Sequence, residues 1–248
     1  RDAGYKTYWL DNQGDHDKGQ TSPMEYRVIV KMCDYVHVIP TIGYDEALLP
    51  FYERCLADTA ENKVIFLHLY GSHFPYEKGA KEEFRVFQAT DTTDIRSPYR
   101  DEMSKEDLAS INMYDNSVRY NDFIVTEVLN RLKKETGMAA MLYFPDHGEE
   151  MCETFNFCGR DPAQMSRSQC EIPFVLWMNQ EYKEKMPLEI DPQRAFCTDD
   201  VIHAIMDLTG VHHALKDTTK SVFSPMYRAK KRMVEVVMEY DSLPKWEK

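Results

Sequence analysis

Short apolar runs alternate along this chain with longer stretches in which apolar residues recur every three or four positions. Four of the runs predict β-strands, at Thr7–Leu10, Val64–Tyr70, Met138–Phe144 and Pro173–Met178. Their apolar residues are nearly continuous, which is typical of strands covered on both faces. Alternation of such strands with helical segments favours an α/β fold of three layers, in which helices cover a central, mostly parallel sheet.

Three stretches have the spacing of amphipathic helices, namely Asp45–Asp58, a long one from Ser104 to Gly137, and Asp199–Leu208. In the long helix, Asp107 follows Ser104 by three residues and predicts a capping box. Gly137 is a suitable stop for it. Thr198 is the expected cap of the last helix, which should end at Gly210.

The rest of the chain shows few organising features. The stretch Phe87–Met103 is polar and aperiodic, which predicts a long surface loop. No repeat, low-complexity tract or linker divides the 248 residues, so we expect a single domain.

Composition narrows the function. The hydrophobic fraction of 43% is ample for a packed core, and the net charge of −12 argues against a nucleic-acid partner. A small anionic substrate is still possible, because a local metal ion can outweigh the global field. No apolar stretch approaches the roughly 18–20 residues that span a bilayer. The chain opens at Arg1 without an initiator Met, so a targeting or membrane segment could precede it.

The cysteines leave two interpretations open. They are Cys33, Cys55, Cys152, Cys158, Cys170 and Cys197, and none forms a CxxC pair. They are either small buried hydrophobic residues or, in an exported domain, members of disulfides. The pair to inspect first is Cys152 with Cys158 or Cys170.

The most informative strand end is followed by the sequence Pro-Asp-His-Gly-Glu-Glu. Asp146 and His147 can direct an oxygen and a nitrogen at one cation, and Gly148 lets the backbone bend there. Such a ligand pair suits zinc or a similar divalent ion. Glu149 and Glu150 could orient a ligand or contact a substrate amine. The alternative is an acidic helix N-terminus that only favours the helix dipole.

A second strand end carries histidines. His73 follows Gly-Ser in a loop and could donate a hydrogen bond to a phosphate oxygen, although a lone loop histidine is often only a surface residue. His68 lies among Phe66, Leu67 and Leu69, which indicates a satisfied core histidine rather than a ligand.

Seven segments, taken in order, resemble the periplasmic domain of the phosphoethanolamine transferases that modify lipid A or the lipopolysaccharide core. That family belongs to the sulfatase branch of the alkaline phosphatase superfamily. The segments are Trp9–Gln13, Tyr44–Pro50, Phe66–Tyr76, Tyr114–Asp122, Asp146–Glu150, Ile172–Phe174 and Thr198–Asp200. The likeness runs from about Trp9 to Phe223–Pro225, and the ordered set is far more specific than any one segment.

The resemblance implies a monomeric periplasmic domain of an inner-membrane protein, anchored by an N-terminal region. A zinc-activated threonine would take phosphoethanolamine from phosphatidylethanolamine and pass it to a glycolipid. Asp146 and His147 match two zinc ligands of the family. His73 matches a histidine near the transferred group, and Glu149 matches an acid beside the metal.

Two departures from the family pattern matter. Its threonine nucleophile and remaining acidic ligand lie well upstream of Trp9–Gln13. Residues 1–248 would then be the larger, C-terminal part of the catalytic domain, inactive and metal-free because two ligands hold zinc poorly. Many relatives also carry Gly-His where this chain has Gly159-Arg160. Arg160 either replaces that histidine as a phosphate donor, or the site has lost function or changed substrate.

Three functions therefore remain open from the sequence: a phosphoethanolamine transferase, a hydrolase of the same superfamily such as a sulfatase or phosphodiesterase, and a non-enzymatic envelope binding module. The enzymatic readings require His73 to converge with Asp146 and His147 on one hollow at the carboxyl edge of the sheet.

Overall fold

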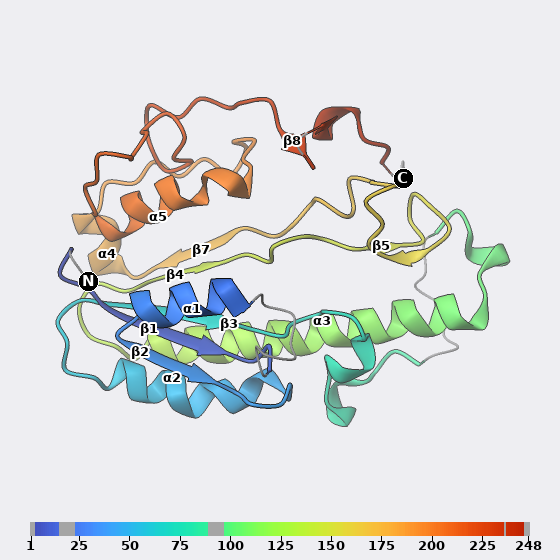
Figure 1. Ribbon diagram of the computed structural model, residues 1–248, viewed down its shortest axis with the longest axis horizontal. Coiled ribbons are helices and arrows are strands. Elements are labelled where there is room, and N and C mark those ends of the chain that lie inside the picture. Colours follow the sequence, from blue (N-terminus) through green and yellow to red (C-terminus); the bar gives the residue numbers. More distant parts are fainter. Residues whose placement is uncertain (1–2, 15–22, 89–96, 236, 246–248) are drawn as a thin grey trace. The chain divides into compact units, whose positions relative to one another are not determined.

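The computed structural model describes residues 3–14, 23–88, 97–235 and 237–245. The chain divides into two compact units. The first comprises Arg1–Ile95 and Glu102–Glu135, and the second comprises Arg96–Asp101 and Thr136–Lys248. Figure 1 labels most of the helices and strands of both units, and each unit is described by itself. The expected single domain stays a prediction.

A parallel three-stranded sheet forms the centre of the first unit (Figure 1). Its order is β2 (Tyr35–Val38), β1 (Lys6–Asp11) and β3 (Lys63–His68). The predicted strands at Thr7–Leu10 and Val64–Tyr70 are confirmed, although β3 ends two residues earlier than expected. These strands and the helices that follow confirm the α/β class.

Burial within this sheet differs from the expectation. The central β1 buries Tyr8 and Leu10, but Phe66 on β3 remains 38% exposed. An edge strand has a neighbour on one side only, so a continuous apolar run does not ensure that it is covered on both faces. The expectation of full coverage was therefore wrong for β3.

Two elements of the first unit were missed by the sequence reasoning, namely α1 (Pro23–Met32) and β2. The sequence Val28-Ile29-Val30 within α1 is β-branched, a composition that favours strands over helices. Strand β2 has four residues, too few to show a period.

The expected helices of the first unit form, with adjusted ends. A 3₁₀ turn over Asp45–Leu48 leads into α2 (Leu49–Leu56), and the long helix is α3 (Lys105–Leu132). The capping box is confirmed, because Ser104 Oγ accepts from the Asp107 N–H at 3.0 Å and Asp107 Oδ2 accepts from the Ser104 N–H at 3.1 Å. The helix ends before Gly137, whose φ of 82° starts the turn towards the next strand.

One side of α3 packs into the core of the first unit. Tyr120 and Ile124, which are almost fully buried, contact Ala80 together with the partly buried Leu69 and Phe84. Two 3₁₀ turns, Tyr76–Lys78 and Glu82–Phe84, connect β3 to this core. The segment after β3 is therefore anchored to the long helix.

The second unit contains the other two predicted strands, β4 (Ala140–Tyr143) and β7 (Val175–Met178). They pair antiparallel, with Ala140 opposite Met178, whereas the strands of the first unit are parallel, as expected for a mostly parallel fold. Parallel neighbours need a long crossover, usually a helix. The described chain between β4 and β7 instead holds a two-stranded hairpin, β5 (Glu150–Met151) with β6 (Cys158–Gly159).

Two short helices and a second two-stranded hairpin follow β7 in the chain. They are α4 (Gln180–Lys185), α5 (Val201–Thr209), β8 (Met233–Val234) and β9 (Met238–Glu239), the last two paired antiparallel. The core cluster here joins Ala204 on α5 to Val222 and Phe223, with Phe174 and Leu176 packed against them.

The ends of α5 confirm one prediction and correct another. Gly210 ends the helix in the left-handed conformation, with a φ of 64°, as expected. Thr198 does not cap it, because Thr198–Asp200 form a 3₁₀ turn of their own with no side-chain cap. The predicted loop Phe87–Met103 contains a 3₁₀ turn at Arg100–Glu102, and residues 89–96 lie outside the described residues.

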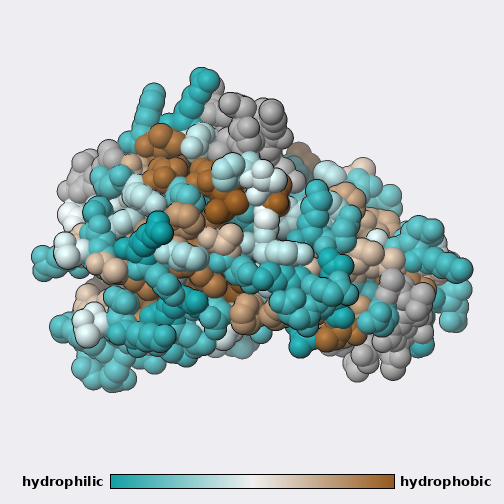
Figure 2. Space-filling model, turned by 90° about the horizontal axis from the view of Figure 1, so that it is seen from below, coloured by the Kyte–Doolittle hydropathy of each residue, from teal (hydrophilic) through white to brown (hydrophobic). Residues whose placement is uncertain are grey.

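The surface is largely hydrophilic. On the face drawn in Figure 2, hydrophilic residues cover most of the area and hydrophobic residues gather in a smaller part of it. Within the described ranges, no helix combines the length and apolar character needed to span a bilayer.

Cys152 and Cys158 lie on the β5–β6 hairpin with their Sγ atoms 3.5 Å apart. The Cys152 N–H donates to the Phe157 carbonyl at 3.0 Å, so the hairpin backbone holds the two cysteines together. Of the two pairings considered from the sequence, the geometry favours Cys152 with Cys158.

We expect a thiol–disulfide oxidant such as oxidised glutathione to join Cys152 to Cys158. Each thiol loses one hydrogen, which the oxidant takes up as its own disulfide is reduced. Closing so short a loop should stabilise the protein by about 2 kcal/mol. Peptide mass spectrometry after alkylation under denaturing conditions should find this pair unlabelled. Cys158→Ser should then match reduced wild type in urea unfolding. Alkylation of both cysteines after oxidation would contradict the prediction.

Candidate functional site

A buried carboxylate organises the carboxyl edge of the first unit's sheet. Asp45 is 3% exposed, and its Oδ1 accepts from Asn12 Nδ2 and from the Tyr70 N–H, each at 2.8 Å. Its Oδ2 accepts from the Gly71 N–H at 2.9 Å. Burial raises the pKa of Asp45, and the three hydrogen bonds oppose that rise. This one side chain therefore ties the end of β1 to the loop after β3.

Asn12 completes the connection on the other side. Its Nδ2 also donates to the Gly43 carbonyl at 2.7 Å, and its Oδ1 accepts from the Gly43 N–H at 3.2 Å. Gln13 Nε2 donates to the Leu69 carbonyl at 2.7 Å. These amides satisfy main-chain groups that the strand ends leave open.

Asp11 ends β1 beside His68 at the end of β3. Its Oδ1 lies 3.2 Å from His68 Nδ1 and accepts from the Gln13 N–H, and its Oδ2 accepts from Trp9 Nε1. Burial would raise the pKa of Asp11, but His68, the Gln13 N–H and Trp9 lower it below its usual value. His68 has the expected partner, yet its side chain is 39% exposed, so the prediction of a core position was wrong.

His73 stands in the Gly-Ser-His loop that Asp45 holds. Its N–H donates to the Tyr70 carbonyl at 3.3 Å, and its ring lies 5.6 Å from that of Tyr70. Its Nδ1 contacts the Phe74 carbonyl oxygen. Because a carbonyl oxygen only accepts, Nδ1 carries a hydrogen in this contact.

Asp146 and His147 form the turn after β4 in the second unit. The His147 N–H donates to Asp146 Oδ1 at 3.1 Å, and His147 Nδ1 lies 2.9 Å from the Gly148 carbonyl oxygen. Because a carbonyl oxygen only accepts, Nδ1 carries the hydrogen and Nε2 keeps its lone pair. Orientation of a ligand histidine by a backbone carbonyl is common in metal sites.

The free nitrogen and the carboxylate are close enough to share an ion. His147 Nε2 lies 3.9 Å from Asp146 Oδ2. Two ligands of one tetrahedral zinc ion stand roughly 3.3 Å apart, given bonds of about 2.0–2.2 Å. The Asp146 side chain is 92% exposed, so rotation can shorten the separation. The pair fits half of a zinc shell.

Gly148 lies so close to neighbouring main-chain carbonyls that this turn has no room for a side chain. A Cβ atom on Gly148 would lie 2.2 Å from the Ser168 carbonyl oxygen and 2.8 Å from that of Glu171. The Gly148 N–H donates to the Gln169 carbonyl at 3.1 Å. The glycine was expected to be needed for bending, but its requirement comes from the neighbouring main chain.

Glu150 stabilises the segment after the same turn through hydrogen bonds in the interior of the second unit. It is fully buried, and its Oε1 accepts from the N–H groups of Glu153 and Thr154 at 2.6 and 2.7 Å. Its Oε2 accepts from Ser166 Oγ at 2.6 Å. Glu150 therefore supports the hairpin and cannot contact a substrate. Glu149 is half-buried beside it.

Arg160 lies at the end of β6 and is exposed. Its Nη2 is 3.2 Å from Glu235 Oε1, and both side chains are well solvated. A surface ion pair of this kind is worth about 0–1 kcal/mol, so a stronger anion can replace Glu235.

The structure brings Asp146 and His147 together, with Glu149 next to them in the chain. His73 belongs to the first unit, so its convergence with them stays a prediction. The sequence reasoning gave no role to Asn12 and Asp45. A signal existed, because an Asn-Gln pair directly after a strand is well placed to satisfy open main-chain groups.

Asp45→Asn should destabilise the first unit by about 1–3 kcal/mol, because an amide offers one acceptor oxygen to three donors. Urea unfolding followed by circular dichroism measures the change. The control Asp122→Asn removes the same charge from an exposed position on α3. Equal midpoints for the two variants would show that the Asp45 connection contributes nothing.

Gly148→Ala should destabilise the second unit by about 1–3 kcal/mol, because backbone oxygens cannot yield to the added methyl group. The control is Gly43→Ala, where the nearest atom lies 3.8 Å from the added Cβ. Thermal unfolding compares the two variants. A melting temperature of Gly148→Ala equal to that of the control would refute the close approach.

Comparison with known proteins places the chain in a family. A family model described as Sulfatase matches residues 1–211. The phosphoethanolamine transferase EptC of Escherichia coli strain K12 is 29% identical over 257 residues, covering 98% of this chain and 44% of that protein. EptA of Helicobacter pylori is 32% identical over 209 residues, covering 82% of this chain and 38% of that protein. The chain thus spans less than half the length of these relatives.

Solved structures agree with the sequence relatives. The C-terminal periplasmic domain of EptC from Escherichia coli superimposes with a TM-score of 0.85 at 29% identity, covering 98% of this chain and 70% of that one. A structure of the same domain in complex with zinc gives a TM-score of 0.85 at 28% identity. The resemblance inferred from the seven ordered segments is confirmed. The chain belongs to the sulfatase family.

Proposed function

We propose that this chain is the periplasmic part of an inner-membrane enzyme that transfers phosphoethanolamine from phosphatidylethanolamine to an envelope glycolipid such as lipid A or the lipopolysaccharide core. The observation that carries the proposal is the Asp146–His147 turn, in which a carboxylate oxygen and an imidazole nitrogen lie 3.9 Å apart. The likeness to EptC and EptA phosphoethanolamine transferases supports this reaction over hydrolysis.

The two ligand residues suit zinc. Asp146 supplies an oxygen and His147 supplies Nε2, a donor set that zinc accepts. When bound, the ion supplies a Lewis acid that lowers the pKa of a hydroxyl nucleophile and balances phosphoryl charge. The zinc complex of the EptC domain supports this metal. Two ligands hold the ion weakly, so residues 1–248 on their own should bind zinc poorly.

Three further residues have proposed roles around the phosphoryl group. His73 donates a ring N–H to a phosphoryl oxygen, and Asp45 positions its loop. Glu149 lies next to the metal turn and orients His147 or the ethanolamine ammonium. The Arg160 guanidinium leaves its ion pair with Glu235 and donates two parallel N–H groups to the phosphate oxygens. Each role is an electrostatic contact with the substrate or the metal.

The proposal is tested in cells that carry the intact gene. Mass spectra of their membrane lipids should show a phosphoethanolamine increment that disappears when the gene is deleted. His147→Ala and Asp146→Asn should each reduce the increment at least about a hundredfold, because a metal ligand is lost. The control Lys183→Ala, an exposed change on α4, should leave it intact.

An Arg160→Ala arm tests the replacement of the family histidine. A sharp loss of the increment supports Arg160 as a phosphate donor, and unchanged activity refutes that role alone. An increment that persists in the gene deletion, or in His147→Ala at wild-type protein level, would refute the transfer reaction at this site.

A further inference from the structure

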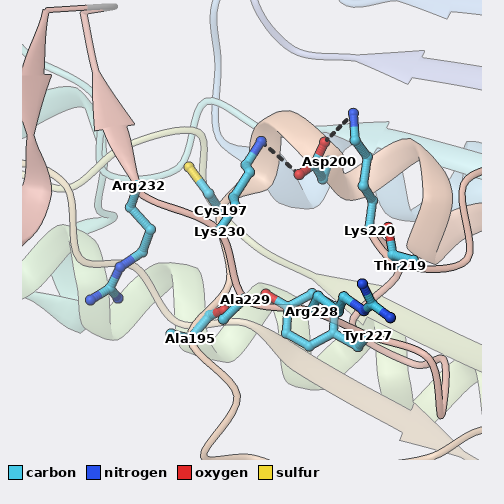
Figure 3. Close-up of a pocket in the computed structure, with 10 residues that line it drawn as sticks. All are labelled: Ala195, Cys197, Asp200, Thr219, Lys220, Tyr227, Arg228, Ala229, Lys230 and Arg232. Carbon is cyan, nitrogen blue, oxygen red and sulfur yellow. Dashed lines mark hydrogen bonds and ion pairs between the residues drawn. The ribbon is translucent and has the colours of Figure 1, made fainter.

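The second unit contains a pocket of about 240 Å³ that the strand-end site does not use (Figure 3). It lies between the start of α5 and the segment from Thr219 to Arg232. Four of its lining side chains are cationic, namely Lys220, Arg228, Lys230 and Arg232. On a chain of net charge −12, such a concentration of positive charge is unusual.

The pocket's own acid is already engaged. Asp200 is 8% exposed, and it lies 2.6 Å from Lys230 Nζ and 3.7 Å from Lys220 Nζ. Lys230 also lies 2.6 Å from Asp199. The dashed lines of Figure 3 show the two lysines converging on Asp200 from opposite sides. These contacts neutralise Lys230 most completely and Lys220 only partly.

Arg232 is oriented away from this group. It pairs with Asp241, and its guanidinium lies 4.2 Å from the ring centroid of Tyr240. In Figure 3 its side chain points away from Asp200 and Lys220. Arg232 therefore borders the pocket without supplying free charge to it.

Arg228 supplies the positive charge that the pocket can offer to an anion. Its backbone N–H donates to the Thr219 carbonyl at 2.8 Å, which fixes it beside Thr219 and Lys220. Across the part of the chain that the structure describes, no carboxylate forms an ion pair with its guanidinium. Figure 3 shows that guanidinium on the side of the pocket where Thr219 and Lys220 stand. The pocket thus presents a planar cation, a partly neutralised lysine and an apolar wall that includes Tyr227.

We propose that this pocket binds a phosphate group, with Arg228 donating two hydrogen bonds to its oxygens and Lys220 supplying a second cation. A guanidinium matches phosphate geometry through two parallel N–H groups, which a lysine alone cannot provide. The same chemistry serves a free phosphate compound and the phosphate of a lipid headgroup. The pocket shares no residue with His73, Arg160 or the Asp146–His147 turn, so its test does not depend on the proposed transfer reaction.

The 248-residue chain is titrated with inorganic phosphate at low ionic strength, and the heat of binding is measured. We expect saturable binding that weakens at least about tenfold in Arg228→Ala and in Lys220→Ala. Arg228→Lys should give an intermediate affinity, because charge is kept and the fork is lost. The matched control Lys183→Ala removes one positive charge from an exposed site elsewhere in the second unit and should bind as wild type.

A second experiment distinguishes a lipid headgroup from a soluble phosphate compound as the ligand. Vesicles of phosphatidylcholine with phosphatidylglycerol should sediment with the protein, and Arg228→Ala should reduce this if a lipid headgroup is the ligand. Phosphate binding without vesicle binding assigns the pocket to a soluble phosphate compound. Absence of saturable phosphate binding, or an equal loss in Lys183→Ala, overturns the proposal. The proposal is also overturned if His147→Ala loses phosphate binding while Arg228→Ala keeps the wild-type affinity for phosphate.

Discussion

The first unit depends on a carboxylate that has been removed from water. Asp45 accepts hydrogen bonds from Asn12 and from the N–H groups of Tyr70 and Gly71, which belong to segments far apart in sequence. Without these bonds, the Asn12 amide beyond β1 and the two N–H groups beyond β3 would lack an acceptor, at a cost of about 1–3 kcal/mol each. The position of the Gly-Ser-His loop follows from that constraint, and the position of His73 follows from the loop.

The second unit fixes its turn by a related device. Gly148 donates to the Gln169 carbonyl and lies so close to the Ser168 and Glu171 carbonyls that no side chain fits. Glu150 then secures the following hairpin from inside. In both units, buried groups stabilise the main chain beside a histidine, which is His73 in the first unit and His147 in the second. Such stabilisation is what a metal or phosphoryl site needs from its supporting residues.

Charge is distributed in keeping with this arrangement. The chain is strongly acidic overall, yet four cationic side chains line one pocket of the second unit, namely Lys220, Arg228, Lys230 and Arg232. A diffuse negative field repels polyanions such as nucleic acid, whereas a local guanidinium binds one phosphate at short range. Net charge therefore excluded one class of partner without excluding phosphate esters.

The sequence by itself determined the strands β1, β3, β4 and β7, the capped helix α3, the family, and the Asp146–His147 pair. These follow from short-range periodicity, capping chemistry and ordered motifs, all of which are local. Only the tertiary structure decided the antiparallel pairing of β4 with β7, the role of Asp45 and the close approach at Gly148. Strand direction depends on the path of the connection, and a buried hydrogen bond depends on segments distant in sequence. Neither leaves a local pattern, because partners about twenty or more residues apart meet only after the chain has folded.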